Sequence, residues 1–223
     1  MVRVIEVHES AFADNDRAAG ALRSELRAKG VTLLNVMSGP GSGKTTLLTA
    51  LIHRLKADLR IAVMDVDIET DLDASRVAEA TGVRALQIHN GGLCHIDAEM
   101  TAACVHSFGV EDTDLLILEN IGNLVCPAEF DTGAHRNVML LSVPEGDDKP
   151  LKYPLMFTVC DLVIITKVDT LPYFPFDFDA CRARIRALNP AAKVLCVSAR
   201  TGEGMEELAD TVRNMILEEK NHA

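Results

Sequence analysis

The stretch SGPGSGKTT, residues 38–46, decides the fold of this 223-residue chain. An apolar run at residues 31–37 precedes it with strand character, and apolar residues at helical spacing follow it. Glycines between a strand and a helix let successive backbone N–H groups point inward at phosphate oxygens. The N-terminus of the helix adds its positive end to the same anion site. The pattern therefore predicts a loop that binds the phosphates of a nucleotide.

Each residue of this loop has an expected task. Lys44 is expected to reach the terminal phosphates, and the Thr45 hydroxyl is expected to coordinate Mg2+. The strict motif has glycine at its first position, where this chain has Ser38. The alternative, a glycine-rich turn without a ligand, conflicts with the intact Gly-Lys-Thr sequence. The residues assigned to the nucleotide are Gly39, Pro40, Gly41, Ser42, Gly43, Lys44, Thr45 and Thr46.

Composition limits the class of protein. With 48% hydrophobic residues, a chain of this length can form one domain with a full core. Its net charge of −11 argues against a nucleic-acid or anionic-membrane surface. No apolar run approaches the roughly 20 residues that span a bilayer, and the N-terminus lacks a secretory signal pattern. We expect a cytoplasmic protein with neither nucleic-acid nor membrane partners, in which the scattered cysteines form no disulfides.

Strand and helix patterns alternate along the chain. Apolar runs predict strands at 31–37, 61–65, 84–88, 115–119, 138–143, 162–166 and 194–197. Helical patterns lie at 14–29, 45–56, 74–81, 97–107, 151–158, 179–188 and 205–217. Continuously apolar strands separated by helices predict an α/β fold, with a mostly parallel sheet covered by helices on both faces. We expect a single domain over residues 1–223, with an N-terminal helical extension over about 1–30 and a long functional loop at 121–136.

The sequence Thr166-Lys167-Val168-Asp169 closes an apolar strand and predicts which base is bound. One carboxylate can accept both the ring N–H and the exocyclic amine of guanine, a donor pair that adenine lacks. We therefore expect Asp169 to select GTP, with the Lys167 stem along the purine face. Asparagine commonly stands where Thr166 does, and threonine can still hydrogen-bond to hold the loop. A later strand is followed by residues whose backbone is expected to contact the guanine oxygen: Ser198, Ala199 and Arg200.

Acidic residues close two further strands, where a response to the γ-phosphate is expected. A carboxylate there can hold Mg2+ and orient the attacking water. We expect Asp65 and Asp67 to face opposite sides of their strand, so that only one serves the nucleotide, and we prefer Asp67. Gly122 can offer its N–H to the γ-phosphate, whose departure would release the following segment. Helix-cap or loop acids are the alternative. The catalytic assignments are Lys44, Asp67 and Glu119, and the Mg2+ ligands are Thr45, Asp67 and Glu119.

Two cysteines and a histidine predict a second metal site. Cys94 and His95 precede a helical pattern, and Cys126 lies seven residues beyond Glu119. We expect Cys94 at the helix N-terminus, where the dipole would stabilise its thiolate. Two thiolates and an imidazole suit Zn2+ or Ni2+. Three ligands are one fewer than a closed tetrahedral site needs, so the site is either exchangeable or completed by a second subunit. Because Cys126 follows the γ-phosphate segment, GTP would control metal affinity.

Four segments together resemble the HypB family of nickel-incorporation GTPases: PGSGKTTLL (40–48), ENIGNLVCP (119–127), SVPEGDDKPLKYP (142–154) and LPYF (171–174). The resemblance implies a slow, dimerising GTPase of the signal-recognition-like (SIMIBI) P-loop class that binds GTP and GDP. It implies nickel delivery to the [NiFe]-hydrogenase large subunit, with a small zinc-containing nickel chaperone as partner. It also implies a GTP-dependent homodimer that holds nickel or zinc at its interface through Cys94, His95 and Cys126.

One departure from that family and three alternatives remain. Some members carry an N-terminal CxxCGC cluster or a His-rich stretch, whereas residues 1–30 here contain no cysteine and only His8. We therefore expect no tight metal-storage site. The alternatives are a urease-type nickel GTPase, whose metal Cys and His are separated by proline, a small-molecule kinase, and a non-catalytic switch in which zinc staples a dimer. Asp169 argues against the kinase. The sequence assigns neither the physiological metal nor a role for Lys149.

Overall fold

The computed structural model describes residues 7–67 and 72–221, without the side chains of residues 7–11, 67, 72 and 73. Seven strands of this part form one sheet in the order β3-β2-β4-β1-β5-β6-β7, and all of its pairings are parallel. The predicted parallel α/β architecture is therefore confirmed. The strands are β1 (Thr32–Ser38), β2 (Ile61–Asp67), β3 (Arg84–His89), β4 (Leu115–Gly122), β5 (Arg136–Ser142), β6 (Leu162–Thr166) and β7 (Lys193–Cys196).

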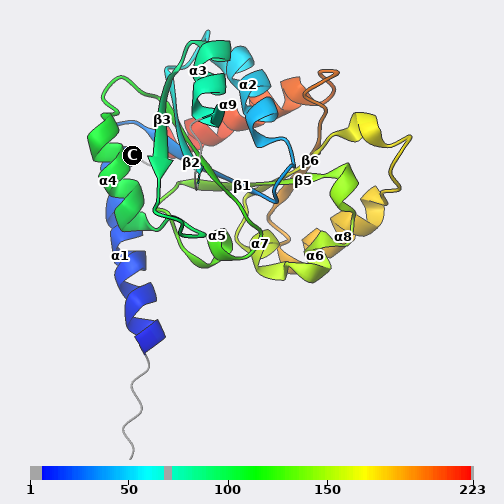
Figure 1. Cartoon of the computed structure of the whole chain (residues 1–223), viewed down its shortest axis with the longest axis horizontal. Coiled ribbons are helices and arrows are strands. Elements are labelled where there is room, and N and C mark those ends of the chain that lie inside the picture. Colours follow the sequence, from blue (N-terminus) through cyan, green and yellow to red (C-terminus); the bar gives the residue numbers. More distant parts are fainter. Residues whose placement is uncertain (1–6, 68–71, 222–223) are drawn as a thin grey trace, which may run out of the picture.

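Helices cover both faces of the sheet (Figure 1). One face packs against α2, α3 and α9, and the other against α1 and α4 on one side and α7 and α8 on the other. The helices are α1 (Val7–Ala28), α2 (Lys44–Leu55), α3 (Leu72–Thr81), α4 (Ala98–Phe108), α5 (Cys126–Glu129), α6 (Lys149–Lys152), α7 (Pro154–Thr158), α8 (Phe178–Leu188) and α9 (Met205–Asn221), with 3-10 turns η1 (Val143–Glu145) and η2 (Val168–Thr170). No helix within the described ranges is long and apolar enough to cross a membrane.

Two expectations about helices and one about a loop were inaccurate. The leading helix begins at Val7 rather than at residue 14. The helix expected over 151–158 is two short helices, because Pro154 disfavours helical geometry at the preceding Tyr153, which has φ −131° and ψ 58°. The loop expected over 121–136 contains the end of β4 and the single turn α5.

The helix α1 is anchored to the sheet by its C-terminal half. Leu22 and Leu26 join the buried cluster beneath β1, β2 and β4. Arg23 donates two hydrogen bonds of 2.8 Å to the carboxylate of Asp131, in the loop before β5. The first turns of α1 project away from the body of the molecule (Figure 1). The helical extension is thus packed into the same core as the strands.

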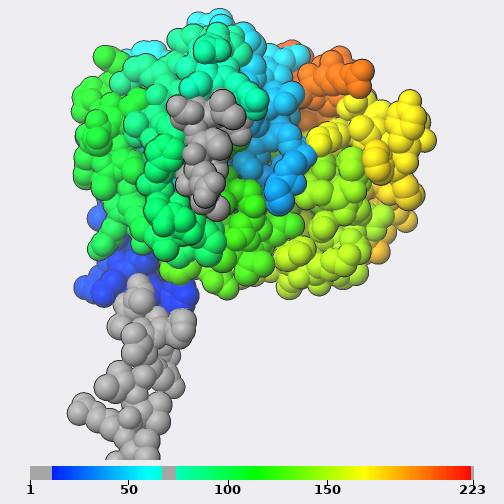
Figure 2. All heavy atoms as spheres, in the orientation of Figure 1, coloured from blue at the N-terminus to red at the C-terminus, as the bar shows by residue number. Residues whose placement is uncertain are grey.

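The sheet brings the ends of its central strands to one edge. Parallel strands place their carboxyl ends together, and ligands of such sheets bind there. One extra residue enters β4 near this edge, because Val36 pairs with Glu119 whereas Ser38 pairs with Gly122. This bulge re-aims the last residues of β4 beside the loop that follows β1. In the space-filling view, the blue loop between β1 and α2 lies between the green middle of the chain and the yellow segment after β6 (Figure 2).

Candidate nucleotide and metal sites

The loop between β1 and α2 has the geometry that the phosphate-binding motif requires. Gly43 precedes the first residue of α2 with φ 94°, a left-handed conformation that disfavours other residues. Lys44 Nζ donates to Ser38 Oγ at 3.0 Å, and Ser38 Oγ donates to the carbonyl of Gly39 at 2.8 Å. The serine that departs from the strict motif therefore holds the lysine at the mouth of the loop, where its ammonium can meet phosphate oxygens.

The expected Mg2+ ligands are partly assembled. Thr45 Oγ1 lies 3.0 Å from Glu119 Oε1, which brings the first residues of α2 to the end of β4. Glu119 is only 2% exposed, and its register partner on β2 is Asp65, which is 4% exposed. The hydroxyl and the carboxylates are the hard oxygen ligands that Mg2+ prefers. The side chain of Asp67, the preferred ligand, lies outside the described residues.

The expectation that Asp65 and Asp67 face opposite sides of β2 was wrong. Both residues belong to one continuous strand, and residues two apart in a strand share a face. Val63, two residues earlier, packs in the cluster formed with α2. Asp65 therefore faces the phosphate-binding side as well, and its pairing with Glu119 in the strand register makes it a candidate for the Mg2+ site alongside Asp67.

A backbone contact connects the phosphate-binding loop to the segment that carries Cys126. A Cβ at Gly122 would lie 3.2 Å from Cα of Pro40, so a larger residue there would press against the phosphate-binding loop. Two residues further on, the side chain of Leu124 lies beside Gly39, 3.6 Å from the position of a Cβ there. If a ligand moved this loop, the residues that lead to Cys126 would therefore have to move with it.

Most residues assigned to the base line one pocket of about 260 Å³ between the phosphate-binding loop and the ends of β6 and β7: Thr166, Lys167, Asp169, Ala199 and Arg200. Ser198 Oγ donates to Asp169 Oδ1 at 2.7 Å, which fixes the carboxylate and leaves its other oxygen for a ligand. Lys167 Nζ donates to the carbonyl of Gly41 at 2.7 Å, and Lys167 itself has φ 57°. The sequence anticipated only a backbone role for Ser198; its hydroxyl also orients Asp169.

The two predicted thiol ligands lie together. Cys94 Sγ is 2.9 Å from Cys126 Sγ, although the residues are 32 positions apart. Hydrogen bonding between the two thiols, followed by burial, raises the pKa of the Cys126 thiol above its ordinary value. Cys94 was expected at a helix N-terminus, but α4 begins at Ala98 and its N-cap is Asp97, whose side chain accepts from Met100 N. The dipole argument for Cys94 is therefore wrong.

The imidazole of His95 does not complete this pair. Its Nδ1 is 3.8 Å from Cys94 Sγ, and its ring stacks on Phe130 with centroids 3.9 Å apart and planes 7° from parallel. Across the described part of the chain, no three His, Cys, Asp or Glu side chains are arranged to hold a metal ion. A tetrahedral metal with bonds of about 2.3 Å to sulfur would separate two thiolates by roughly 3.8 Å. Metal binding thus requires the sulfurs to part and the imidazole to turn.

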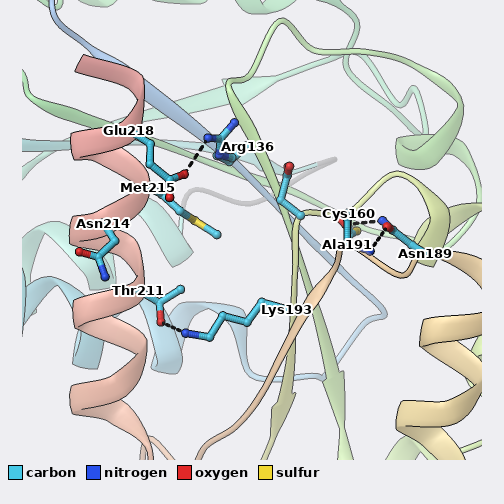
Figure 3. Close-up of a pocket in the computed structure, with 10 residues that line it drawn as sticks. Arg136, Cys160, Asn189, Ala191, Lys193, Thr211, Asn214, Met215 and Glu218 are labelled. Carbon is cyan, nitrogen blue, oxygen red and sulfur yellow. Dashed lines mark hydrogen bonds and ion pairs between the residues drawn. The ribbon is translucent and has the colours of Figure 1, made fainter. Parts of the chain in front are cut away.

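A different cavity, of about 480 Å³, lies at the amino-terminal edge of the sheet (Figure 3). Its charged groups have partners, since Arg136 donates to Glu218 at 3.1 Å and Lys193 to the Thr211 hydroxyl at 2.8 Å. Asn189 donates to the carbonyl of Cys160 at 2.8 Å. The first two contacts tie β5 and β7 to α9, and none of the predicted site residues lines this cavity.

Comparison with known proteins places the chain in a family. A family model described as "CobW/HypB/UreG, nucleotide-binding domain" matches residues 32–196. The hydrogenase maturation factor HypB of Azotobacter chroococcum is 47% identical over 92% of this chain and 67% of its own length. HypB of Escherichia coli K12 is 45% identical over 92% and 70%. Helicobacter pylori strain J99 has a hydrogenase/urease maturation factor HypB that is 38% identical over 97% and 88%.

Comparison with solved structures points to the same family. A crystal structure of HypB from Helicobacter pylori in complex with nickel aligns with a TM-score of 0.85 at 39% identity, covering 92% of this chain and 96% of that one. HypB from Archaeoglobus fulgidus aligns with a TM-score of 0.84 at 38% identity, covering 92% and 99%. The signal recognition particle receptor FtsY of Elizabethkingia anophelis, at 16% identity and a TM-score of 0.54 over 84% and 69%, shares the fold. On this evidence, the chain belongs to the CobW/HypB/UreG nucleotide-binding family, among the HypB hydrogenase maturation factors.

Proposed function

We propose that this chain is a GTPase that couples GTP binding and hydrolysis to the capture and release of nickel during hydrogenase maturation. The observation that carries the proposal is the contact between Gly122 and Pro40, because it joins the phosphate-binding loop to the segment ending in Cys126. A γ-phosphate near the Gly122 N–H would hold that segment, and its loss would release it. The metal site would then differ between the GTP and GDP states.

Hydrolysis would use the residues already gathered at the loop. Lys44 and a Mg2+ held by Thr45 and Glu119 would neutralise charge on the transferred phosphoryl group, with Asp65 or Asp67 completing the carboxylate set. Neither acidic segment, 65–67 nor 119–127, contains an arginine. An arginine finger is worth about 10³–10⁵ in turnover. We therefore propose a slow GTPase, for which the time in each nucleotide state matters more than the rate.

Nickel is the proposed cargo, with zinc as a competitor for the same thiols. The donor set of two sulfurs and one imidazole suits both metals. The nickel-bound structure of the Helicobacter pylori relative, which shares this fold at 39% identity, supports nickel. Cys94, His95 and Cys126 are the proposed ligands, and their unassembled arrangement supports a site that forms only when the metal is taken up.

A GTP-dependent homodimer is part of the proposal. Leu93 and Val125 each directly precede a thiol, and they are 42% and 49% exposed. Large apolar side chains around a polar site are typical of a surface that another subunit covers. A second copy would exclude water from the thiols and could supply the fourth ligand that three residues leave missing. A small zinc-containing chaperone and the hydrogenase large subunit are the proposed onward partners.

The test is a titration of Ni2+ and Zn2+ into purified protein loaded with GDP or with a non-hydrolysable GTP analogue. Light scattering would follow the oligomeric state in the same samples. We expect metal affinity and dimerisation to change together when the nucleotide changes. Identical metal affinity in both states would contradict the coupled mechanism. It would favour the alternative in which zinc only links two subunits structurally.

A urease-type role is the second candidate. Relatives from Helicobacter are described as hydrogenase/urease maturation factors, at 38–40% identity. The adjacent Cys94 and His95, without an intervening proline, favour the hydrogenase role, as do the relatives at 45–48% identity. Complementation of strains lacking nickel insertion into hydrogenase or into urease separates the two.

A further inference from the structure

The base pocket is lined by one carboxylate, that of Asp169, and by several side chains that can donate hydrogen bonds. Its floor is formed by Ser42 and Gly43 on one side and by Thr166, Lys167 and Asp169 on the other. Asp169 is acceptor-only when ionised, which matches the N–H edge of guanine. Guanine also carries acceptors on its other edge, N7 and O6. Whether the pocket reads N7 depends on which side-chain hydrogens are available.

The Thr166 hydroxyl is already engaged. Thr166 Oγ1 donates to the main-chain carbonyl of Ser42 at 2.9 Å, and Thr166 is only 4% exposed. A carbonyl only accepts, and a hydroxyl has a single hydrogen. Thr166 therefore cannot hold the phosphate-binding loop and donate to a base at the same time.

Two neighbouring donors also contact main-chain carbonyls, and Arg200, another donor side chain that lines the pocket, is exposed. Thr170 Oγ1 donates to the carbonyl of Lys167 at 2.7 Å. The ammonium of Lys167 is drawn to the carbonyl of Gly41 at 2.7 Å, on the phosphate-binding loop. Among the described pocket residues, the buried hydroxyl without a hydrogen-bond partner belongs to Ser42, which is 1% exposed. The Ser42 hydroxyl is thus the alternative donor that the experiment must test.

We propose that this pocket recognises guanine by its N1 and N2 donor edge and is indifferent to N7, because Thr166 uses its only hydrogen to hold the Ser42 carbonyl. The inference rests on the proposed GTP binding and specifies its ligand class. Guanine nucleotides that carry carbon at position 7 bind as well as GTP. An asparagine at position 166 has two N–H donors, one for Ser42 and one for N7. Thr166→Asn would therefore create a preference that the natural chain lacks.

The experiment compares GTP with 7-deaza-GTP by competition against a fluorescent GDP analogue on the purified full chain. In the unmodified protein we expect the two dissociation constants to agree within about twofold. In Thr166→Asn we expect GTP to bind more tightly than 7-deaza-GTP by roughly 2–12-fold, the net value of one hydrogen bond. Thr166→Val removes the tie to Ser42 and should weaken both nucleotides equally, so the ratio separates base reading from loop stability.

Two results would overturn the inference. One is a preference of more than about twofold for GTP over 7-deaza-GTP in the unmodified chain. If Ser42→Ala then removed that preference, the Ser42 hydroxyl would be the group that reads N7. The other is an unchanged ratio in a folded, nucleotide-binding Thr166→Asn protein. Failure of the proposed function is distinguishable, because neither guanine nucleotide would then bind in any variant.

Discussion

The nucleotide site and the thiol site lie at the same edge of the sheet but differ in how far they are assembled. In the nucleotide site, the predicted side chains already contact one another or the loop: Thr45 with Glu119, Asp169 with Ser198, and Lys167 with Gly41. In the thiol site, two sulfurs are close but the imidazole of His95 stacks on Phe130. The first site is preorganised, whereas the second must rearrange around its ligand.

The two sites differ in assembly because different secondary structure supports them: strand ends in one, a loop and a single helical turn in the other. The nucleotide residues follow directly from buried parallel strands, whose ladder fixes their positions. Cys94 lies in a loop of exposed residues between β3 and α4, and Cys126 opens a single turn of helix. A preorganised site gives tight binding, while a site that must rearrange can be switched. The proposed capture of a nucleotide and release of a metal would use these two behaviours.

The largest expected effect tests the preorganised site. Lys44→Ala removes the ammonium that Ser38 holds at the loop, and GTP turnover should fall by roughly 10²–10³-fold. Phosphate release measured under saturating GTP checks this. Lys56→Ala, at the other end of α2, is the matched control and should keep normal turnover. Normal turnover in Lys44→Ala would remove the phosphate-loop assignment.

The next effect tests the thiol site. Cys126→Ala removes one proposed ligand, and nickel affinity should fall by more than the roughly 10–100-fold typical of losing an outer-shell partner. Nucleotide affinity should stay unchanged, which isothermal titration with each ligand can measure. Cys104→Ala, a partly buried cysteine on α4, is the control. Undiminished nickel binding in Cys126→Ala would contradict the placement of the metal on this segment.

A smaller effect sharpens the account of base selection. Asp169→Asn replaces an acceptor by an amide that can also donate, so GTP affinity should fall by roughly 10–100-fold while XTP binding improves. Competition with both nucleotides measures the change, and Asp179→Asn, an exposed carboxylate on α8, is the control. Unaltered guanine preference would show that another group selects the base.

The smallest effect concerns the scaffold beneath the nucleotide site. His135 accepts from Leu33 N at 3.0 Å and contacts the Arg23 carbonyl at 3.1 Å, joining α1 to β1. Burial lowers the pKa of His135 below its ordinary value. The unfolded chain therefore binds more protons, so stability is full above a pH of about 6.5 and is lost as the pH falls below it.

Urea unfolding at pH 7.5 and pH 5.5 checks this expectation. The midpoint should be lower at pH 5.5, and in His135→Gln the difference between the two values should shrink. His106, which pairs with Glu25 at the surface, provides the control variant His106→Gln. An equal pH dependence in His135→Gln and the unmodified protein would assign the effect to other groups.

Much of the fold was predictable because its strands are short apolar runs with clear breaks. β6, Leu162–Thr166, matched its prediction, and the other strands differed by one to three residues at their ends. The errors fell where local pattern is weak. The turn α5 was missed because four residues have too little periodicity to identify a helix. The faces of Asp65 and Asp67 were misassigned although the period of two decides them.

For the nucleotide and metal sites, the sequence predicts which residue types take part but not which of them contact one another. The motifs predict roles for Lys44, Thr45 and Asp169 because phosphate, magnesium and guanine each demand a particular chemistry at a particular spacing. Nothing local signalled that the Ser198 hydroxyl orients Asp169, or that Phe130 stacks on His95. These contacts join residues 29 and 35 positions apart, so they exist only once the chain is folded.

The sequence by itself determined the parallel α/β fold, the phosphate-binding loop and the family. Each is encoded locally, in apolar periodicity and in the residues that a ligand requires. Only the tertiary structure decided that Gly122 touches Pro40, that the two thiols meet while His95 stands apart, and that Thr166 uses its single hydrogen on Ser42. These are distances between strand ends and loops, and such distances are set by sheet order and register rather than by local sequence.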